Sequence, residues 1–403
     1  MRTDASDVTV VGASAAGLFV AARLAAEGAQ VRVLERAAAL PPPARTLIAT
    51  HRLRRLLGPV GDGSIVNEIR TFELFADGVV ASIGLHRPDV IVERSALVRD
   101  LADQARASGA DIRLGQSFVR ADVSSDGMSV VSEDSATKRQ DVISSPTLVG
   151  ADGAMSRVAR DGGWPQQTTV PLVQALVRCP AGLPADTVRV WFRPHETPYF
   201  YWLIPEGDGR GVVGLIGERR HAVRAHLDGF LLERRLTPLA YQAARIPLYQ
   251  RWRPVRKRLR SGAVYLVGDA AGHVKSTTVG GLVTGFRGAE AVAETILGRR
   301  TSLLRSLRVE LDLHVMVRRV LQRFGESEYK RLLDLISPAE HRLLSGYTRD
   351  ETSRLLWRLC VREPRFALLA LRGLMAGRSE ELGDVSVERV EPAGRAAQSS
   401  ALT

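Results

Sequence analysis

The pattern of apolar and polar residues predicts a strand, a glycine-rich turn, a helix and a second strand at the start of the chain. Residues 8–17 are a short β-branched run followed by the sequence GASAAG. Residues 18–27 are rich in alanine and leucine, which favour helix. A second apolar run at 31–34 leads into Glu35 and Arg36. This order of elements is typical of a βαβ unit in an α/β fold.

The pattern changes between residues 166 and 256, where short runs of alternating or aromatic-rich sequence are separated by turn residues. This stretch predicts an antiparallel sheet inserted as a second domain. A buried strand pattern returns at 264–267, before a predicted helix at 282–297. We therefore expect four segments: a dinucleotide-binding domain split between 1–165 and 257–300, the sheet domain at 166–256, and a helical region at 301–403 with a frayed tail.

The turn at residues 12–17 is a variant of the GxGxxG fingerprint of dinucleotide-binding proteins. Gly12 permits the sharp turn from strand to helix, and Gly17 permits the helix to pack closely on the strand. The residues between them that can face a ligand are small: Ser14, Ala15 and Ala16. A pyrophosphate would be attracted by the free N–H groups at the helix N-terminus. Glu35 is placed to accept hydrogen bonds from a ribose hydroxyl, so we predict a dinucleotide site.

Charge and cysteine content narrow the possible partners. The 403 residues carry 56 basic and 44 acidic side chains, a formal net charge of +12. Only four of the basic residues are lysines, so either the codon bias of a GC-rich genome or a functional basic surface explains the excess of arginine. No nucleic-acid-binding motif is present, and we expect no nucleic-acid partner. Cys179 and Cys360 have no metal-type spacing, so no metal site is expected.

The sequence predicts a cytoplasmic protein, because it shows neither a disulfide framework nor a secretory signal. No apolar run reaches the roughly 18–20 residues of a membrane-spanning helix. The C-terminal arginines Arg354, Arg358, Arg362 and Arg365 recur among apolar residues. Helices of this kind either dock on the protein body or rest on an anionic membrane, here its inner face.

Three ordered motifs identify a resemblance. GASAAG with Glu35 and Arg36, GADG at 150–153 and GDAAG at 268–272 each follow a predicted strand. In this order they resemble FAD-dependent oxidoreductases of the geranylgeranyl reductase and class A flavoprotein monooxygenase superfamily, over about residues 7–300. The resemblance implies an α/β fold, with a discontinuous Rossmann-like FAD-binding domain, an inserted antiparallel substrate domain and a C-terminal helical region. It also implies roles in FAD binding for Arg94, Asp152, Gly268 and Asp269.

The sequence that follows Asp269 resembles the VKPTTGGG turn of geranylgeranyl reductases, with Ser276 in place of proline and Val279 in place of one glycine. By the resemblance, backbone N–H groups and a helix N-terminus would reach the flavin from three consecutive residues: Gly280, Gly281 and Leu282. Arg45 resembles an arginine that contacts flavin or substrate in related hydroxylases, the alternative being a solvated loop residue. No cysteine occurs at 43–48, where some reductases carry one.

An aromatic run at 199–205 resembles a strand that covers the flavin ring in the same families. Strand alternation would place Tyr199, Tyr201 and Leu203 on one face, and Phe200, Trp202 and Ile204 on the other. One face would pack in the core and the other would line a lipophilic pocket, the alternative being that all of these side chains belong to the core. The candidate proton donors near the flavin are His273, Lys275 and Tyr201.

The favoured function is a geranylgeranyl-reductase-like enzyme that reduces or desaturates a carbon–carbon bond of a prenyl, polyene or polyketide-like substrate by hydride transfer at flavin N5. The alternative is a monooxygenase that hydroxylates or epoxidises a natural product through a flavin C4a-hydroperoxide. A non-catalytic prenyl-binding protein remains a third reading. Electrons would come from NAD(P)H or from a reduced electron-transfer protein. The six basic residues at 251–260 either form a solvated surface loop or attract a cofactor phosphate, an acidic electron-transfer protein or a pyrophosphate substrate.

Overall fold

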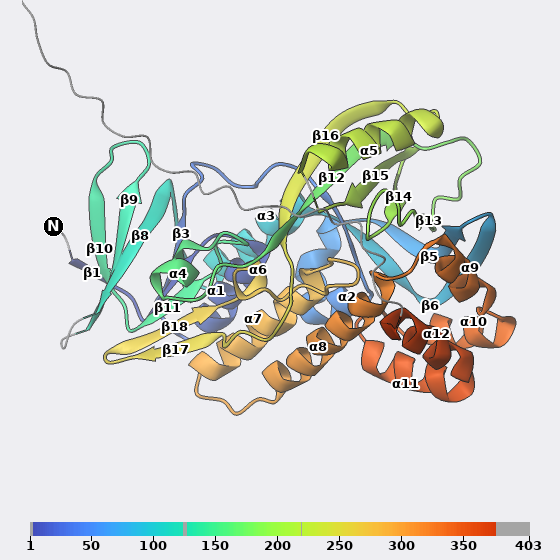
Figure 1. The fold of residues 1–403 in the computed structure, drawn as a ribbon. Helices are drawn as coiled ribbons and strands as arrows, with labels where there is room; N and C mark the ends of the chain where they lie inside the picture. The colour runs from blue at the N-terminus through green and yellow to red at the C-terminus, as the bar shows by residue number, and fades with distance from the viewer. Residues whose placement is uncertain (1–2, 124–126, 219, 376–403) are drawn as a thin grey trace, which may run out of the picture.

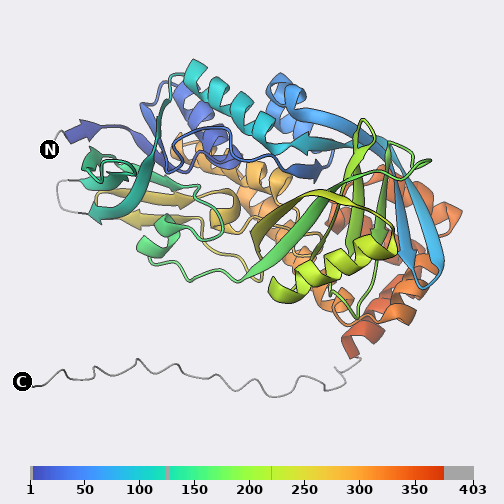
Figure 2. The same ribbon diagram turned by 90° about the horizontal axis from the view of Figure 1, so that it is seen from above.

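The computed structural model describes residues 3–123, 127–218 and 220–375 and arranges them around three β-sheets (Figures 1 and 2). A six-stranded and a four-stranded sheet form the end of the molecule that holds the N-terminus, and an eight-stranded sheet forms the other end. The C-terminal helices lie against the eight-stranded sheet (Figure 1). The tail that was expected to fray lies outside the described residues from 376 onward.

The six-stranded sheet has the order β17-β18-β11-β2-β3-β7. Its strands are β2 (Val8–Val11), β3 (Val31–Glu35), β7 (Asp111–Leu114), β11 (Thr147–Gly150), β17 (Arg256–Leu259) and β18 (Gly262–Leu266). All neighbours are parallel except β17, which pairs antiparallel with β18 at the edge. Parallel strands are covered on both faces, which explains why every residue of the β-branched strand β2 is buried.

Helices cover the six-stranded sheet and complete the main core. They are α1 (Ala15–Ala26), α3 (Arg94–Ala107), α4 (Arg157–Asp161), α6 (Gly268–Ala271) and α7 (Leu282–Ile296). Helix α1 packs between α3 and α7, and Phe19 meets Phe286 edge-on with ring centroids 5.1 Å apart. The four-stranded sheet lies alongside and has the order β1 (Thr3–Ala5), β10 (Gln140–Ser144), β9 (Met128–Asp134) and β8 (Gln116–Val123).

The eight-stranded sheet has the order β16-β12-β15-β14-β13-β5-β6-β4. Its strands are β4 (Thr46–Ala49), β5 (Ile65–Ala76), β6 (Val79–Glu93), β12 (Thr169–Arg178), β13 (Thr187–Trp191), β14 (Tyr201–Gly207), β15 (Arg210–Ile216) and β16 (Pro238–Pro247). Helix α5 (Arg220–Glu233) packs on β12 and β15 (Figure 2). A short helix α2 (Arg52–Leu57) and a 3₁₀ helix at Gly58–Ser64 connect β4 to β5.

Three strands of this sheet come from residues 46–93, which the sequence analysis assigned to the dinucleotide-binding segment 1–165. Strand β5 belongs to the eight-stranded sheet because it pairs in parallel with β13, which lies more than 100 residues later in the chain. Such a long-range pairing leaves no local mark on the sequence. The eight-stranded sheet therefore includes strands from outside the predicted 166–256 segment.

The aromatic run differs in one position from the expected alternation. Strand β14 begins only at Tyr201, and Tyr199 precedes it. Tyr199 therefore packs in the same apolar cluster as Trp202 and Ile204, whereas Tyr201 and Leu203 pack in the cluster under α5. The predicted grouping of Tyr199 with Tyr201 is wrong, because the strict alternation of a strand does not extend beyond its end.

The C-terminal region consists of α8 (Leu303–Leu321), α9 (Glu326–Asp334), α10 (Pro338–Gly346), α11 (Thr352–Arg362) and α12 (Pro364–Met375). Helix α8 packs on α7, α9 packs on β5 and β6, and α10 packs on β6. Arg358, Arg362 and Arg365 are exposed, and the side chain of Arg354 lies outside the described part of the chain. Within the described residues, no helix combines the length and the apolar character that crossing a bilayer would require.

Candidate active site

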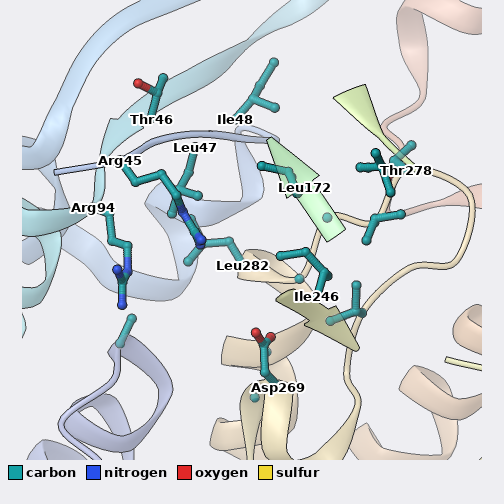
Figure 3. Close-up of a pocket in the computed structure, with 18 of the residues that line it drawn as sticks. Arg45, Thr46, Leu47, Ile48, Arg94, Leu172, Ile246, Asp269, Thr278 and Leu282 are labelled. Atoms are coloured by element: carbon teal, nitrogen blue, oxygen red, sulfur yellow. The ribbon is translucent and has the colours of Figure 1, made fainter. Parts of the chain in front are cut away.

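One cavity lies where the carboxyl ends of the parallel strands meet the eight-stranded sheet (Figure 3). Its floor comes from segments that directly follow β2, β11 and β18. Its opposite wall comes from β5, β12, β13, β14, β15 and β16. Ligands of open α/β sheets bind at this edge, because the turns there expose backbone N–H groups.

The first glycine turn has the close approaches that the fingerprint predicts. Gly12 has φ +101°, and a Cβ atom there would lie 2.6 Å from the carbonyl oxygen of Ala151. A Cβ atom at Gly17 would lie 2.3 Å from the carbonyl oxygen of Gly12. Ser14 caps α1 by accepting a hydrogen bond from the N–H of Gly17 at 3.3 Å. Both glycines are therefore required by geometry, and the N-terminus of α1 is directed at the cavity.

Glu35 fastens this turn from the end of β3. Its carboxylate accepts hydrogen bonds from the backbone N–H groups of Ala13 at 2.8 Å and Ala37 at 2.9 Å. A carboxylate has about four acceptor positions, so two remain for ribose hydroxyl groups. Arg36 is exposed, and its carbonyl oxygen accepts a hydrogen bond from Ser135.

Two arginines and one carboxylate face each other across the cavity (Figure 3). Burial raises the pKa of Asp269, and the positive charges of Arg45 and Arg94 oppose that rise. Burial lowers the pKa of both arginines. The Nε atom of Arg45 is buried and has no hydrogen-bond partner among the described residues. Because an unpaired buried donor is costly, this atom is suited to an acceptor on a bound ligand.

The side chain of Asp152 forms hydrogen bonds within the protein and does not face the cavity. Its carboxylate accepts hydrogen bonds from the hydroxyl of Ser156 at 2.5 Å and from the backbone N–H groups of Arg157 and Val158. It therefore holds the N-terminus of α4. The neighbours Ala151 and Gly153 line the cavity, whereas Asp152 does not.

The loop before α7 carries the third motif to the cavity. Gly280, Gly281 and Leu282 line the cavity, and α7 begins at Leu282. The backbone N–H of Val279 donates to Lys275 at 2.8 Å, and that of Lys275 donates to Gly280 at 3.2 Å. Val279 has φ +52°, the left-handed conformation that a glycine adopts readily. A β-branched residue in this conformation is strained, and such strain is concentrated at ligand sites.

The three candidate proton donors all lie away from the cavity. Tyr201 points to the other face of its sheet, where it donates a hydrogen bond to Glu196 and stacks on Phe230. His273 is buried against α7 and stacks on Trp252, and burial lowers its pKa to about 3. Its ring is therefore neutral near pH 7, and a neutral imidazole is a very weak acid.

Lys275 is the third of these candidates, and it is buried in an ion pair with Asp350, 2.7 Å away. None of the three side chains lines the cavity. The motifs place these three residues in segments that form the cavity, but the sequence does not predict the direction in which their side chains point.

The structure brings ten of the fifteen predicted cofactor-binding residues to the cavity wall. They are Ser14, Ala15, Ala16, Arg45, Arg94, Gly268, Asp269, Gly280, Gly281 and Leu282. The other five, Gly12, Gly17, Glu35, Arg36 and Asp152, lie behind this wall or at the surface.

Four polar residues of the wall were not identified from the sequence: Thr46, Gln174, Thr278 and Arg349. Gln174 sits in a strand whose alternation would have placed it beside Leu172 on the cavity face. Arg349 comes from the connection between α10 and α11, and no sequence signal marks it.

The basic stretch at 251–260 is partly used within the fold. Lys257 donates hydrogen bonds to the carbonyl oxygens of Gly162 and Gly163 and lies over the Trp164 ring, while Arg253 donates to Pro165. Arg256 lies over the ring of Tyr265. The exposed basic residues of the stretch are Arg251, Arg258 and Arg260. They lie near β17, at the edge of the six-stranded sheet.

Comparison with known proteins agrees with this geometry. Residues 5–226 match the family model described as FAD binding domain. A digeranylgeranylglycerophospholipid reductase 2 from Methanopyrus kandleri is 27% identical over 328 residues, 72% of this chain and 77% of the relative. A digeranylgeranylglycerophospholipid reductase 1 from Methanothermobacter thermautotrophicus is 25% identical over 408 residues, 91% of this chain and 97% of the relative.

Solved structures share the fold. A geranylgeranyl bacteriochlorophyll reductase-like protein from Thermoplasma acidophilum superposes with a TM-score of 0.74 at 16% identity, covering 91% of this chain and all of the other. The p-nitrophenol 4-monooxygenase of Pseudomonas putida gives a TM-score of 0.63 at 19% identity, covering 93% and 99%. The resemblance and the α/β fold class predicted from the motifs are confirmed. The chain belongs to the FAD binding domain family, as an FAD-dependent oxidoreductase similar to geranylgeranyl reductases.

Proposed function

We propose that the protein reduces or desaturates a carbon–carbon bond of a lipophilic prenyl, polyene or polyketide-like substrate. The observation that carries the proposal is the apolar wall that faces the FAD-type turns inside a single cavity. This wall consists of Leu47, Ile48, Phe72, Leu172, Val188, Val190, Phe200, Trp202, Ile204, Ile216 and Ile246. An apolar chain held on this wall would lie opposite the loop that precedes α7.

The residues present fit FAD. The small residues at 14–16 and the N-terminus of α1 would hold the pyrophosphate, and Glu35 would accept from the ribose. Asp269 would accept from the ribityl hydroxyls, and Arg45 and Arg94 would donate to the cofactor from the opposite side. Bound FAD supplies hydride transfer at N5. The N-terminus of α7 would stabilise negative charge that develops on the bound cofactor.

The apolar wall contributes orientation and exclusion of water. Trp202 and Ile204 on one face of β14 line the cavity, as does Phe200, which directly precedes the strand. Helix α5 covers the other side of the sheet. Because His273, Lys275 and Tyr201 point elsewhere, we assign the proton to solvent rather than to one of these side chains. Thr278 provides a hydroxyl at the cavity wall through which such a proton could pass.

Electrons are proposed to come from NAD(P)H or from a reduced electron-transfer protein. The exposed arginines at 251, 258 and 260 offer positive charge to either donor. The exposed arginines of α11 and α12 offer a second positive surface, next to the apolar residues Trp357 and Leu368. This surface suits peripheral contact with an anionic membrane.

A monooxygenase is the second candidate, supported by the shared fold with the p-nitrophenol 4-monooxygenase and by the apolar wall of the cavity. One experiment separates the two. Chemically reduced holoenzyme is mixed with geranylgeraniol or a geranylgeranyl phospholipid under anaerobic conditions, and products are analysed by mass spectrometry. A product heavier by two hydrogens supports the reductase. No product until ¹⁸O₂ is admitted, followed by incorporation of one ¹⁸O atom, would establish the monooxygenase instead.

A further inference from the structure

A second cavity of about 770 Å³ adjoins the first, on the side of the C-terminal helices. Its walls are α2, the β5–β6 hairpin, and the segment from the end of α10 to the start of α11. The hairpin and α10 are joined across it by a hydrogen bond between His86 and Ser345, at 3.0 Å. We call this space the arginine vestibule.

The vestibule is strongly positive. Five arginines line it: Arg52, Arg54, Arg55, Arg87 and Arg349. Two carboxylates oppose them, Asp89 paired with Arg349 and Glu351 paired with Arg52. Arg54 is paired with Asp62 and Glu68 outside the wall. Within the described part of the chain, no ion pair is formed by Arg55 or Arg87, and both are exposed toward the mouth. An anion entering the vestibule would meet uncompensated charge.

One wall of the vestibule is apolar. Phe72 and Ile83 are directly paired across the β5–β6 hairpin, and Leu74 and Leu85 also face the cavity. Contact with this wall would not stabilise a free inorganic anion, because the hydrophobic effect favours burial of apolar groups only. Positive mouth and apolar wall together fit an amphiphile, with one anionic end and one hydrocarbon end.

The two cavities share Phe72 and Arg349. The guanidinium of Arg349 lies 5.0 Å from the centre of the Phe72 ring, so the two side chains form the partition. Arg349 is itself held by the buried carboxylate of Asp89. A hydrocarbon chain that follows the apolar wall past Phe72 would enter the flavin cavity.

We propose that the arginine vestibule binds the phosphate or carboxylate group of an amphipathic substrate whose hydrocarbon chain extends past Phe72 toward the flavin. As a statement about substrate, the inference rests on the proposed function. The anion at the mouth would hold the chain in one direction and limit how far it can enter. This would fix which carbon–carbon bond reaches the flavin.

The test is a binding measurement that needs no turnover. Holoenzyme is titrated by calorimetry with dodecyl phosphate, dodecanol and inorganic phosphate, each below its critical micelle concentration where one exists. Dodecyl phosphate should bind at least 10-fold more tightly than either of the others. In the double variant Arg55→Gln/Arg87→Gln, this advantage over dodecanol should fall to below about 3-fold.

The matched control is Arg139→Gln, which removes one exposed arginine on the β9–β10 turn, far from the vestibule. It should keep the wild-type preference, and all variants should keep their FAD content. An unchanged preference in the double variant would overturn the proposal. Inorganic phosphate binding as tightly as dodecyl phosphate would overturn it too, by assigning the site to a free anion. A protein that shows the expected preference yet reduces no alkene would refute the proposed function and leave the binding site standing.

Discussion

Lys275 and Asp350 form a buried ion pair, with Nζ of the lysine 2.7 Å from Oδ1 of the aspartate. Their side chains are only 8% and 0% exposed, although 75 residues separate them. Thr50 also donates a hydrogen bond to Asp350. Lys275 belongs to the loop that carries Gly280 and Gly281 to the cavity. The pair therefore ties the cavity-facing loop to the connection between α10 and α11.

Breaking this pair from one side should destabilise the fold strongly. Asp350→Asn leaves a buried ammonium without its partner, a change that typically costs about 3–5 kcal/mol. Lys275→Met leaves the buried carboxylate of Asp350 without its lysine partner. The double variant Lys275→Met/Asp350→Asn should be less destabilised than the sum of the single variants, because no charge remains buried. Urea unfolding measures all three free energies.

The control for this set is Lys138→Met, which replaces a lysine with a 72% exposed side chain and should change stability by less than about 0.5 kcal/mol. Loss of FAD from the single variants at temperatures where they remain folded would show that the pair positions the loop. Strictly additive effects in the double variant would contradict the coupling.

His273 makes stability depend on pH in a specific window. Burial lowers its folded pKa to about 3, whereas an unfolded histidine has a pKa of about 6.5. The unfolded chain therefore takes up a proton first, so stability is highest above pH 6.5 and falls as the pH is lowered. Between pH 7 and pH 5 this group should remove about 2 kcal/mol. The lowered pKa of Asp350 acts in the same direction, but only below about pH 4.

The variant His273→Leu should remove this loss between pH 7 and pH 5, as measured by urea unfolding at both values. His195→Gln, which replaces a histidine with a 60% exposed side chain, serves as the comparison and should keep the wild-type loss. An undiminished loss in His273→Leu would assign the pH dependence to other groups.

Two glycines with positive φ allow the effect of backbone strain to be distinguished from that of a steric clash. Gly12→Ala places a Cβ atom 2.6 Å from the carbonyl oxygen of Ala151, in addition to the strain of φ +101°. Gly28→Ala has φ +88° and open space around the new atom. The second variant should cost about 1–2 kcal/mol and keep its FAD. The first should lose FAD or fail to fold, as shown by flavin absorbance and thermal melting. Equal behaviour of the two variants would show that the close approach at Gly12 is unimportant.

Asp269 should contribute directly to holding FAD. Replacing it with asparagine removes a charge that faces Arg45 and Arg94. It should also weaken the hydrogen bonds that we propose Asp269 makes to the cofactor. A charged hydrogen bond contributes about 1.5–3 kcal/mol, so FAD affinity should fall roughly 10- to 100-fold. Fluorescence titration of apoprotein with FAD measures this, with Asp103→Asn, at a 65% exposed side chain on α3, as the control. Unchanged affinity would remove Asp269 from the cofactor site.

The sequence predicted what depends on local geometry. The turn at 12–17 and the segments around Asp269 and Gly280 reach the cavity because each directly follows a strand or precedes a helix. It did not predict what depends on distant pairing. Strand β5 joins β13, and Arg349 reaches the cavity only because the α10–α11 connection packs on the sheet. It also could not give the direction of His273, which depends on a helix packed behind it.

The two faces of β14 allow residues that line the cavity to be distinguished from residues that only pack in the core. Trp202 lines the cavity, and its indole N–H is buried without an acceptor in the described residues. Tyr201 is on the opposite face, where Phe230 stacks on its ring at 4.4 Å. Trp202→Phe should lower kcat/KM for the lipophilic substrate at least 10-fold, because it removes both a donor and part of the wall. Tyr201→Phe should leave kcat/KM within 2-fold and lower stability by about 1–2 kcal/mol, the cost of losing a buried hydrogen bond. A reversed result, with Tyr201→Phe inactive and stable, would restore Tyr201 as a proton donor and require β14 to be turned by one residue.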